Sequence, residues 1–406
     1  MICDIGGGQF YILNKSKVLR EQGYDVQIIS HVRGKILIDD FKQYENLICE
    51  ELMYPPNYYS NLKKDSLIES IINKLKNCKT NTEKIIIESH HESVAFWGEL
   101  LASKIHAKHI IYFIGESCVK FSPQEMDFIK FKDKRKELYV VSKHTYEQIY
   151  NEKLEDIDIS YLLWSALAFS SVTNSNNVLV DSYEKKEVNI GSIGRLDKPF
   201  VNNMIDNIII FAQKHSEISV GVLLAGGAVD KRIEEDIFKR LSDQSNIFPV
   251  ITGYIVPLPM KIFELMDVFI SSSSSANISY QQNVPTIAID AEDYEPIGVL
   301  GFNTTSVMYR NSNSKSNICQ YLEKIFFEKF CEKHKYVRYN YEEFDSYKEY
   351  LKQLSAIEEL MNLEINNQYY NVGNLHLCGS RLVKLIIFKL LGAKHYYKLK
   401  TIHMIK

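Results

Sequence analysis

The sequence predicts an α/β protein built from two doubly wound halves. Short apolar runs alternate with amphipathic helical patterns through most of the chain, which is typical of parallel strands joined by crossover helices. A polar stretch over 171–187, rich in Ser, Asn and charged residues, interrupts this alternation, and the pattern then starts again. Because the pattern restarts instead of closing, we expect two open sheets and not one barrel.

The length of the chain also favours two domains. A chain of 406 residues exceeds the size at which a single hydrophobic core stops growing. We expect an N-terminal doubly wound domain over 1–175, a C-terminal doubly wound domain over 176–335 and a helical, basic segment over 336–406.

The expected elements follow from the spacing of apolar residues. In the first half, strands are predicted at 24–30, 83–90, 107–116 and the start of 136–151, and helices at 65–77, 92–106 and the end of 136–151. In the second half, strands are predicted at 188–197, 218–227, 247–255, 268–275 and 284–290, and helices at 200–216, 231–244 and 259–267.

Composition excludes several classes of protein. Hydrophobic residues make up 45% and charged residues 24% of the chain, as in soluble globular proteins. A net charge of −3 argues against a dedicated nucleic-acid binder. No apolar run reaches the roughly 18 residues of a transmembrane helix, and no signal-peptide pattern is present. Seven dispersed cysteines without a CxxC pair favour a reduced, cytosolic protein without a zinc site.

Ligands of open α/β sheets bind beyond the carboxyl ends of the strands, so the loops after the strands are the candidate sites. The opening stretch "DIGGGQF" places Gly7 and Gly8 between a strand stub and a helix. Glycines there let the backbone approach a ligand phosphate at a helix N-terminus. A simple tight turn is the alternative, since GGG matches neither a dinucleotide fingerprint nor a P-loop.

The stretch "GSIGRLDKP" is more specific. A strand ends at Gly194 and is followed by Arg195 and Lys198. A guanidinium and an ammonium a few residues apart suit a diphosphate, because the guanidinium binds in a bidentate manner and the ammonium adds a point charge. A solvated surface pair is the alternative interpretation.

Two further loops offer small or polar groups. "LLAGG" ends a strand at the Gly226 turn, and "ISSSSSANIS" brings Ser274, Ser275 and Asn277 to the start of a helix. Small residues there allow close backbone approach and supply hydrogen-bond donors. A flexible N-cap loop is the alternative.

Two more polar groups follow predicted strands. His90 in "IESHHES" could bond a sugar hydroxyl or orient a reacting group, with a structural role as the alternative. Since His90 and His91 are adjacent and point in different directions, they do not predict a metal site. Glu292 in "IDAEDYEPIG" could hold a ribose or sugar hydroxyl, with a charged surface loop as the alternative.

The order of these motifs resembles that of GT-B glycosyltransferases, in particular the retaining, family 4-like group of bacterial surface polysaccharide and capsule synthesis. The glycine loop is followed by "IGSIGRLDK", "VLLAGG", "TGYI", "MDVFIS" and "NVPTIAID" over roughly residues 1–310. The resemblance implies two Rossmann-like domains facing a central cleft. It also implies that Gly7 and Gly8 line the donor phosphate, that Arg195 and Lys198 hold the diphosphate, and that His90 lies near the transferred sugar.

The sequence departs from this family in two places. Members usually carry a pair of glutamates between the "DVF" strand and the "GxP" turn, whereas no glutamate occurs between Val268 and Ala291. Phe200 stands where the family has a lysine after "GRL". Tyr280, Gln281 or Glu292 are then the candidates for the missing ribose contact.

The C-terminal segment is basic. No Asp or Glu occurs between Ile365 and Lys406, where apolar residues alternate with Arg381, Lys384, Lys389, Lys394, Lys398, Lys400 and Lys406. A basic amphipathic helix with aromatic residues suits an anionic bilayer surface. A helix that packs back on the N-terminal domain is the alternative, and the two are compatible.

Together these features and the resemblance predict a metal-independent hexosyltransferase of the cytoplasm or the inner face of the plasma membrane, and the resemblance implies that it retains the anomeric configuration. Its donor substrate would be a nucleotide-diphosphate sugar, with no separate cofactor, and its acceptor a glycan or a lipid-linked sugar. A nucleotide-sugar epimerase of the same fold and a non-catalytic sugar-nucleotide-binding subunit are the alternatives. The run Ile2–Ile5 is short for a first strand, which leaves open that the natural chain extends upstream.

Overall fold

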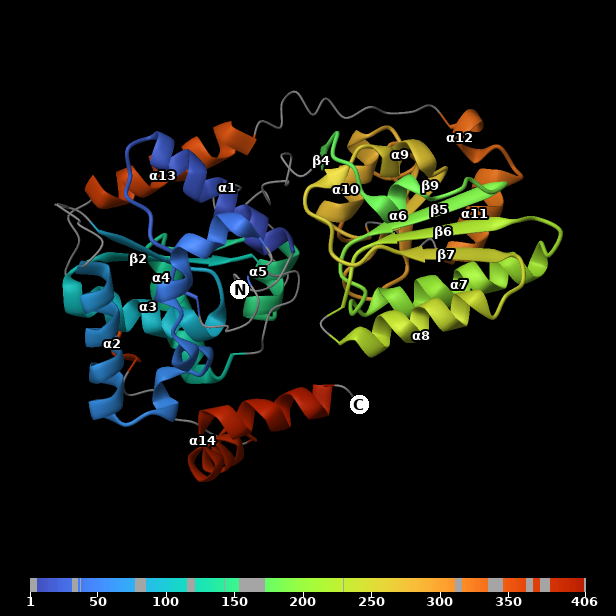
Figure 1. Cartoon of the computed structure of the whole chain (residues 1–406). Coiled ribbons are helices and arrows are strands. Elements are labelled where there is room, and N and C mark those ends of the chain that lie inside the picture. The colour runs from blue at the N-terminus through green and yellow to red at the C-terminus, as the bar shows by residue number, and fades with distance from the viewer. Residues whose placement is uncertain are drawn as a thin grey trace. The chain divides into compact units, whose positions relative to one another are not determined.

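The computed structural model describes residues 6–30, 36, 38–76, 85–114, 121–141, 143–152, 172–228, 230–310, 316–334, 346–362, 368–372 and 380–404. The chain divides into two compact units (Figure 1). The first unit comprises Ile12–Ser165 and Tyr347–Lys406, and the second comprises Ala166–Ser346 together with Ile5–Tyr11. The expected strand stub Ile2–Ile5 lies outside the described residues.

The first unit is built on a parallel sheet with the strand order β1-β2-β3. The central strand is buried along its whole length, as expected where helices cover both faces of a sheet. The strands are β1 Ile86–Ser89, β2 Lys108–Phe113 and β3 Leu138–Val140. The helices are α1 Gly7–Glu21, of which the part from Ile12 onward belongs to this unit, α2 Asn61–Lys76, α3 Glu92–Ile105, α4 Pro123–Lys134, α5 Lys143–Tyr150, α13 Ser346–Asn362 and α14 Ser380–Met404. The 3₁₀ helices are η1 Asp39–Leu47, η2 Glu50–Met53 and η3 Pro56–Tyr58.

Local sequence signals start the helices that flank this sheet. The side chain of His91 accepts a hydrogen bond from the N–H of Ser93 and caps α3. Ser122 and Glu125 form a reciprocal capping box at the start of α4, where proline occupies the first turn, an arrangement that satisfies two otherwise unpaired N–H groups. These caps fix where each crossover helix begins relative to the preceding strand.

The strand expected at 24–30 does not form. The guanidinium of Arg20 donates to the carbonyl of Val26 at 3.1 Å, and the N–H of Tyr24 donates back to the Leu19 carbonyl at 3.0 Å. Because these backbone groups are bonded locally, they are not available to a sheet ladder. Ser30 makes only an isolated bridge to Ile48.

The second unit contains a six-stranded sheet in the order β11-β10-β9-β5-β6-β7. All neighbouring pairs are parallel except β10 and β11. The strands are β5 Val188–Ile193, β6 Val220–Ala225, β7 Ile247–Ile251, β9 Val268–Ser271, β10 Thr286–Ile289 and β11 Pro296–Val299; a separate parallel pair is β4 Val172–Thr173 with β8 Leu258–Pro259. The helices are α6 Val178–Asp181, α7 Phe200–Lys214, α8 Lys231–Ser242, α9 Lys261–Leu265, α10 Ser274–Gln281, α11 Ile318–Phe326 and α12 Phe330–Lys333.

Helices cover both faces of this sheet. On one face, α7, α8 and α11 share a large apolar core with β5, β6 and β9, and α7 and α8 lie side by side along the sheet (Figure 1). On the other face, α6 and α9 pack against alternate residues of the same strands. Met204, Ile205 and Ile208 of α7 are fully buried, and their helical spacing explains why this helix was predicted from the sequence.

The order of strands creates a topological switch point between β5 and β9. The chain runs outward from β5 through β6 to β7, then returns to the other side of β5 and continues through β9 to β10. In open parallel sheets, the loops at such a point diverge and leave room for a ligand. The candidate site is therefore expected after β5 and β9.

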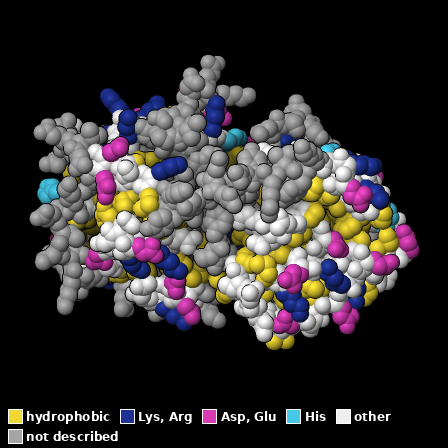
Figure 2. Space-filling view, turned by 90° about the horizontal axis from the view of Figure 1, so that it is seen from above, with side chains coloured by type: hydrophobic (Ala, Val, Ile, Leu, Met, Phe, Trp, Pro, Cys, Tyr) yellow, Lys and Arg dark blue, Asp and Glu magenta, His cyan; other side chains and the backbone are white. Residues whose placement is uncertain are grey.

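The surface carries charges of both signs. On the face drawn in Figure 2, Lys and Arg are interspersed with Asp and Glu, in line with the net charge of −3. Among the described residues, no helix combines the length and the apolar content needed to cross a membrane.

Candidate functional site

The loops that follow β5 and β6 are joined by their backbones. The N–H of Gly194 donates to the Ala225 carbonyl at 3.1 Å, and the N–H of Leu196 donates to the Gly227 carbonyl at 3.0 Å. Gly194 has a φ of +128°, which favours glycine. The sequence-predicted residues Gly194 and Gly226 are thus brought together at the carboxyl ends of adjacent strands.

Gly226 has no room for a side chain. A Cβ atom at this position would lie 1.7 Å from the carbonyl oxygen of Gly194. Because this oxygen is a backbone atom, a change of side-chain rotamer cannot relieve the clash. The close approach of the two loops therefore requires glycine here.

We expect Gly226→Ala to lower the free energy of unfolding by about 1–3 kcal/mol and to speed hydrogen exchange at the amides of Gly194 and Leu196, because the two loops must separate. Gly253→Ala is the control, since Gly253 has a φ of +70° and open space around it, so that only backbone strain is added. Equal exchange rates at Gly194 and Leu196 in the two variants would show that the predicted clash is absent.

Arg195 and Lys198 lie in the same loop. The Nε of Arg195 is 3.5 Å from a carboxylate oxygen of Asp197, and the Arg195 side chain is 37% exposed. The ammonium of Lys198 lies 6.0 Å from the centre of the Phe200 ring. Phe200 itself is buried in the core, so its side chain contributes to packing.

The serine loop stands at the other side of the switch point. β9 ends at Ser271 and α10 begins at Ser274. Between them, Ser273 has φ 55° and ψ −129°, a conformation that is rare for a residue with a side chain. The Ser271 hydroxyl accepts a hydrogen bond from the N–H of Ile193 at 3.3 Å and so ties this loop to the end of β5.

The serine loop and the glycine loop are in contact. A Cβ atom on Gly194 would lie 3.3 Å from the hydroxyl of Ser275. The first turn of α10 thus begins beside the Gly194–Lys198 loop and presents backbone N–H groups with a partial positive charge. The helix terminus thus lies beside the loop that carries Arg195 and Lys198, and a helix N-terminus is a favourable place for a phosphate group.

Gly7 and Gly8 lie in the first turn of α1 and not in a loop before it. Their segment, Ile5–Tyr11, groups with the second unit. A Cβ atom on Gly7 would lie 3.1 Å from the hydroxyl of Ser274. The close approach of Ser274 therefore explains why a residue without a side chain is favoured at position 7.

The remaining predicted residues of this edge have different surroundings. Asn277 is buried on α10, whereas Glu292 is exposed in the loop after β10. That loop is ordered by Asp290, whose carboxylate accepts hydrogen bonds from the N–H groups of Glu292 at 2.8 Å and Arg310 at 2.7 Å. Tyr280 is buried in an apolar cluster. The sequence interpretation had singled out Glu292 and missed the organising role of Asp290.

In the first unit, His90 belongs to a buried cluster that the sequence did not reveal. The ammonium of Lys15 contacts the Glu88 carboxylate at 2.9 Å and lies 3.9 Å from the centre of the Tyr112 ring. The Nε2 of His90 is 3.6 Å from the second Glu88 oxygen, and its ring stacks on Tyr112 at 5.6 Å between centroids. We call Lys15, Glu88, His90 and Tyr112 the His90 cluster.

Burial determines the charge state of this cluster. It lowers the pKa of His90 to about 4, against the attraction of Glu88, and the charge of Lys15 lowers the pKa further. Burial also lowers the pKa of Lys15, and Glu88 opposes the shift. His90 is therefore neutral at neutral pH and can both donate and accept a hydrogen bond.

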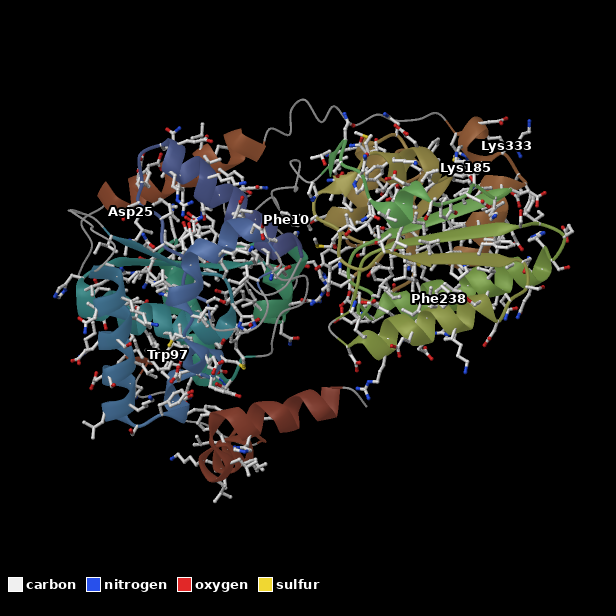
Figure 3. The ribbon with its side chains drawn as sticks, viewed as in Figure 1. Phe10, Asp25, Trp97, Lys185, Phe238 and Lys333 are labelled. Atoms are coloured by element: carbon white, nitrogen blue, oxygen red, sulfur yellow. The ribbon has the colours of Figure 1, made fainter. Side chains whose placement is uncertain are left out.

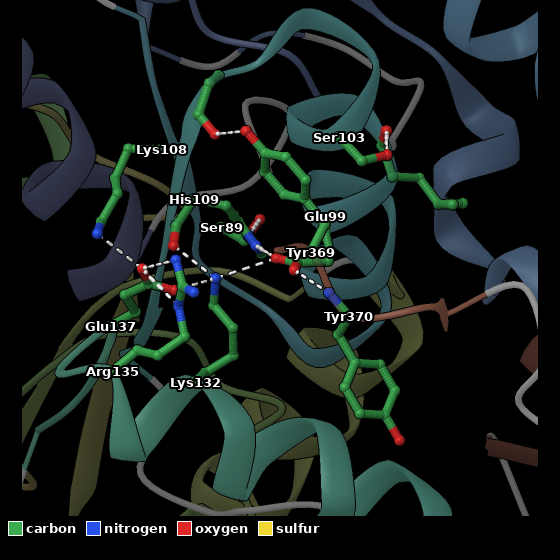
Figure 4. A network of polar contacts seen from close by, with 12 residues as sticks. Ser89, Glu99, Ser103, Lys108, His109, Lys132, Arg135, Glu137, Tyr369 and Tyr370 are labelled. Atoms are coloured by element: carbon green, nitrogen blue, oxygen red, sulfur yellow. Dashed lines mark hydrogen bonds and ion pairs between the residues drawn. The ribbon is translucent and has the colours of Figure 1, made fainter. Parts of the chain in front are cut away.

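A second buried network lies at the opposite, amino end of β2 (Figure 4). The ammonium of Lys132 contacts Glu99 at 3.0 Å and Glu137 at 2.6 Å, and Glu99 also bonds Nδ1 of His109 at 2.7 Å. Ligands of such sheets bind at the carboxyl ends, so this network lies away from the edge where a ligand is expected. Within the described part of the chain, no group of three or more His, Cys, Asp or Glu side chains is placed to hold a metal ion.

The sequence matches no protein-family model and no curated protein. Solved structures are similar to it over most of the chain. A glycosyltransferase from Rickettsia africae has 15% sequence identity and a TM-score of 0.56, with 89% of this chain and 97% of that chain covered. HepE from Anabaena, solved with UDP and glucose, has 11% identity and a TM-score of 0.56, with 88% and 97% covered.

The lipopolysaccharide outer core galactosyltransferase WaaB, in its apo form, is also similar, with 12% identity, a TM-score of 0.51 and coverage of 88% and 97%. At these identities the likeness shows the fold alone. The chain has the GT-B fold, with two Rossmann-like domains, as the sequence predicted.

Proposed function

We propose that this protein is a glycosyltransferase that moves a sugar from a nucleotide-diphosphate donor to a glycan or lipid-linked acceptor. The observation that carries the proposal is the edge at the β5–β9 switch point, where the Gly194–Lys198 loop, the Gly226 turn and the start of α10 meet. Support also comes from the GT-B fold and from HepE, a similar structure that was solved with UDP.

The proposed chemistry matches what this edge can supply. When the bond between the sugar and the diphosphate breaks, negative charge grows on the leaving diphosphate. Preorganised donors that face that charge lower the barrier to reaction. In our proposal Arg195 and Lys198 supply two cationic side chains, and α10 supplies backbone N–H groups, so that the site needs neither a metal ion nor a separate cofactor.

The remaining assignments rest on the resemblance of the motifs. Gly7, Gly8, Ser274, Ser275 and Gly226 would allow the donor to approach the backbone, while Asn277 and Glu292 would contact its sugar or ribose hydroxyls.

His90 would lie near the transferred sugar, where its neutral ring would bond a hydroxyl. The reaction would retain the anomeric configuration, which NMR spectroscopy of the product would test directly. The expected central cleft between the two domains stays a prediction.

Incubation of the protein with a panel of sugar nucleotides, with and without glycan and lipid-linked acceptors, tests the function. Donor consumption that requires an acceptor supports sugar transfer. Isomerisation of the donor without an acceptor would identify an epimerase instead. Thermal stabilisation by a sugar nucleotide without turnover would identify a binding subunit, an alternative favoured by the absence of glutamate between Val268 and Ala291.

We expect Arg195→Ala to weaken binding of a nucleoside diphosphate by about 1–3 kcal/mol, the scale of a hydrogen bond to a charged group. Isothermal titration calorimetry with UDP measures the change. Arg240→Ala is the matched control, because Arg240 lies in the last turn of α8 and pairs with Asp206. Equal affinities of the Arg195 and Arg240 variants would remove Arg195 from the site.

We further propose a cytoplasmic location with peripheral attachment to the inner face of the plasma membrane. A lipid-linked acceptor would be reached most directly from that position. The sequence feature behind this proposal is the basic C-terminal segment, which carries no Asp or Glu after position 364.

A further inference from the structure

The first part of α14 carries its apolar side chains on the outside of the protein. Six large apolar residues within ten positions are exposed, and Leu390 reaches 79%. A surface helix normally turns its apolar face toward the core. The first part of α14 differs, because it also carries apolar residues on the side that faces away from the core. The six residues, which we call the outer face of α14, are Leu382, Val383, Ile386, Ile387, Leu390 and Leu391.

The opposite side of α14 fixes the helix to the first unit. Phe388 is only 6% exposed and packs on the rings of Tyr54 at 4.8 Å and Tyr58 at 5.1 Å between centroids. The carbonyl of Tyr54 accepts a hydrogen bond from the indole of Trp97 at 2.7 Å, and Trp97 is buried inside this unit (Figure 3). The helix that carries the outer face is therefore anchored to the first unit by the packing of Phe388.

Positively charged side chains border the outer face. With about 100° between successive residues of a helix, Ile386 and Leu390 lie on the side opposite Phe388. Lys384 and Lys389 then fall on either flank of the apolar stripe, and both are exposed. Lysines in such flanking positions can extend their charge toward phosphate groups while their stems remain beside apolar surface.

We propose that the outer face of α14 docks onto the surface of an anionic lipid bilayer, with the helix lying in the headgroup region. An interfacial helix of this kind combines an apolar face with basic flanks, and each lysine near an anionic surface adds to the attraction. The sequence contains no acidic residue after position 364 to oppose it. A second copy of the same face fits less well, because it would bring lysines of like charge together.

This docking goes beyond sugar transfer and does not depend on it. Its test is co-sedimentation of the full chain with vesicles, without any sugar nucleotide. We expect binding to vesicles of phosphatidylcholine and phosphatidylglycerol in equal parts, and binding at least about tenfold weaker to phosphatidylcholine alone, because two lysines lose their attraction. Failure to bind the mixed vesicles would overturn this proposal together with the peripheral membrane attachment proposed above, and would leave the proposed sugar transfer untouched.

Variants locate the contact. Ile386→Ser with Leu390→Ser should weaken binding to the mixed vesicles by more than about tenfold, because two apolar side chains no longer enter the bilayer surface. Lys384→Gln with Lys389→Gln should remove most of the preference for anionic lipid. The control is Phe238→Ser, which changes an apolar residue that is 48% exposed on α8 (Figure 3).

Circular dichroism and the melting temperature show whether each variant is folded. If the Phe238 variant loses as much binding as the Ile386 and Leu390 variant, the proposed contact is wrong. The proposal is equally overturned if sedimentation in the absence of vesicles shows a dimer that the Ile386 and Leu390 changes convert to a monomer, because a second copy then covers this face.

Discussion

Replacing Lys132 by methionine is expected to lower the free energy of unfolding of the first unit by about 3–5 kcal/mol. The ammonium of Lys132 contacts the carboxylates of Glu99 and Glu137 and the carbonyl of His109 at 2.7 Å (Figure 4). All three charged side chains are almost fully buried. Methionine would leave the Glu99 carboxylate in a dry environment without its cation, whereas Glu137 keeps Lys108 at 2.8 Å and Arg135 at 3.1 Å. The desolvation cost of Glu99 is therefore the main source of the loss.

Urea unfolding followed by tryptophan fluorescence measures this effect, since Trp97 is buried in the same unit. Lys130→Met is the matched control, because Lys130 is an exposed residue on the same helix and its replacement should change stability by less than about 0.5 kcal/mol. A second change, Glu99→Gln, should recover part of the loss in the Lys132 variant because it removes one of the buried charges. Similar losses for the two lysine variants would contradict the prediction.

The first unit is also expected to lose stability as the pH falls from about 6.5 to 4. Burial lowers the pKa of His109 to about 4, and the charge of Lys132 adds to the shift, against the attraction of Glu99. The unfolded chain therefore binds a proton before the folded chain does, so that acid favours unfolding in this window. The shift corresponds to about 3 kcal/mol, and His90 shifts in the same direction.

Glu99 extends this loss to lower pH. Burial alone would raise its pKa, but the hydrogen bond from His109 and the charge of Lys132 outweigh burial and lower the pKa to about 2. A carboxyl whose folded pKa is depressed contributes stability above its unfolded pKa, and that stability is lost as the pH falls through the folded value. The two effects together predict a steep decline on the acid side.

Thermal unfolding measured across pH 4–7 tests this prediction. His109→Gln should reduce stability at pH 7, because Ser89 and Glu99 lose a partner, and should flatten the decline between pH 6.5 and 4. His106→Gln is the control, since His106 is exposed at the end of α3 and should leave the slope unchanged. An undiminished slope in the His109 variant would show that this residue is not the group that titrates.

Elements with regular apolar spacing could be predicted from the sequence, because burial follows periodicity. Strand β2 and helix α7 were found in this way. Helix α4 was missed although Ser122, Pro123 and Glu125 form a typical start signal, because its inward side includes the polar residue Lys132. The strand expected at 24–30 was wrong, and there the carbonyl of Val26 and the N–H of Tyr24 bond to α1 instead of to a neighbouring strand.

The candidate site was predictable only in part, because contacts between distant segments leave no pattern in the local sequence. Gly194 and Gly226 stand out in the sequence because glycines that end strands are conspicuous, and the structure adds why they are needed. The conformation of Ser273 and the pairing of Lys15 with Glu88 left no local signal, since they arise from contacts between segments distant in the chain. That Arg195 and Lys198 bind a diphosphate stays a prediction.

The bonds that hold Gly194 and Leu196 against Ala225 and Gly227 involve main-chain atoms alone. These two hydrogen bonds therefore do not depend on the side chains of Asp197 and Lys198, although the close approach of the loops requires glycine at Gly226. Residues such as Asp197 or Lys198 can be exchanged during evolution or by protein engineering while the support beneath them persists. Libraries that vary these two positions would therefore be a sound starting point for altering ligand preference.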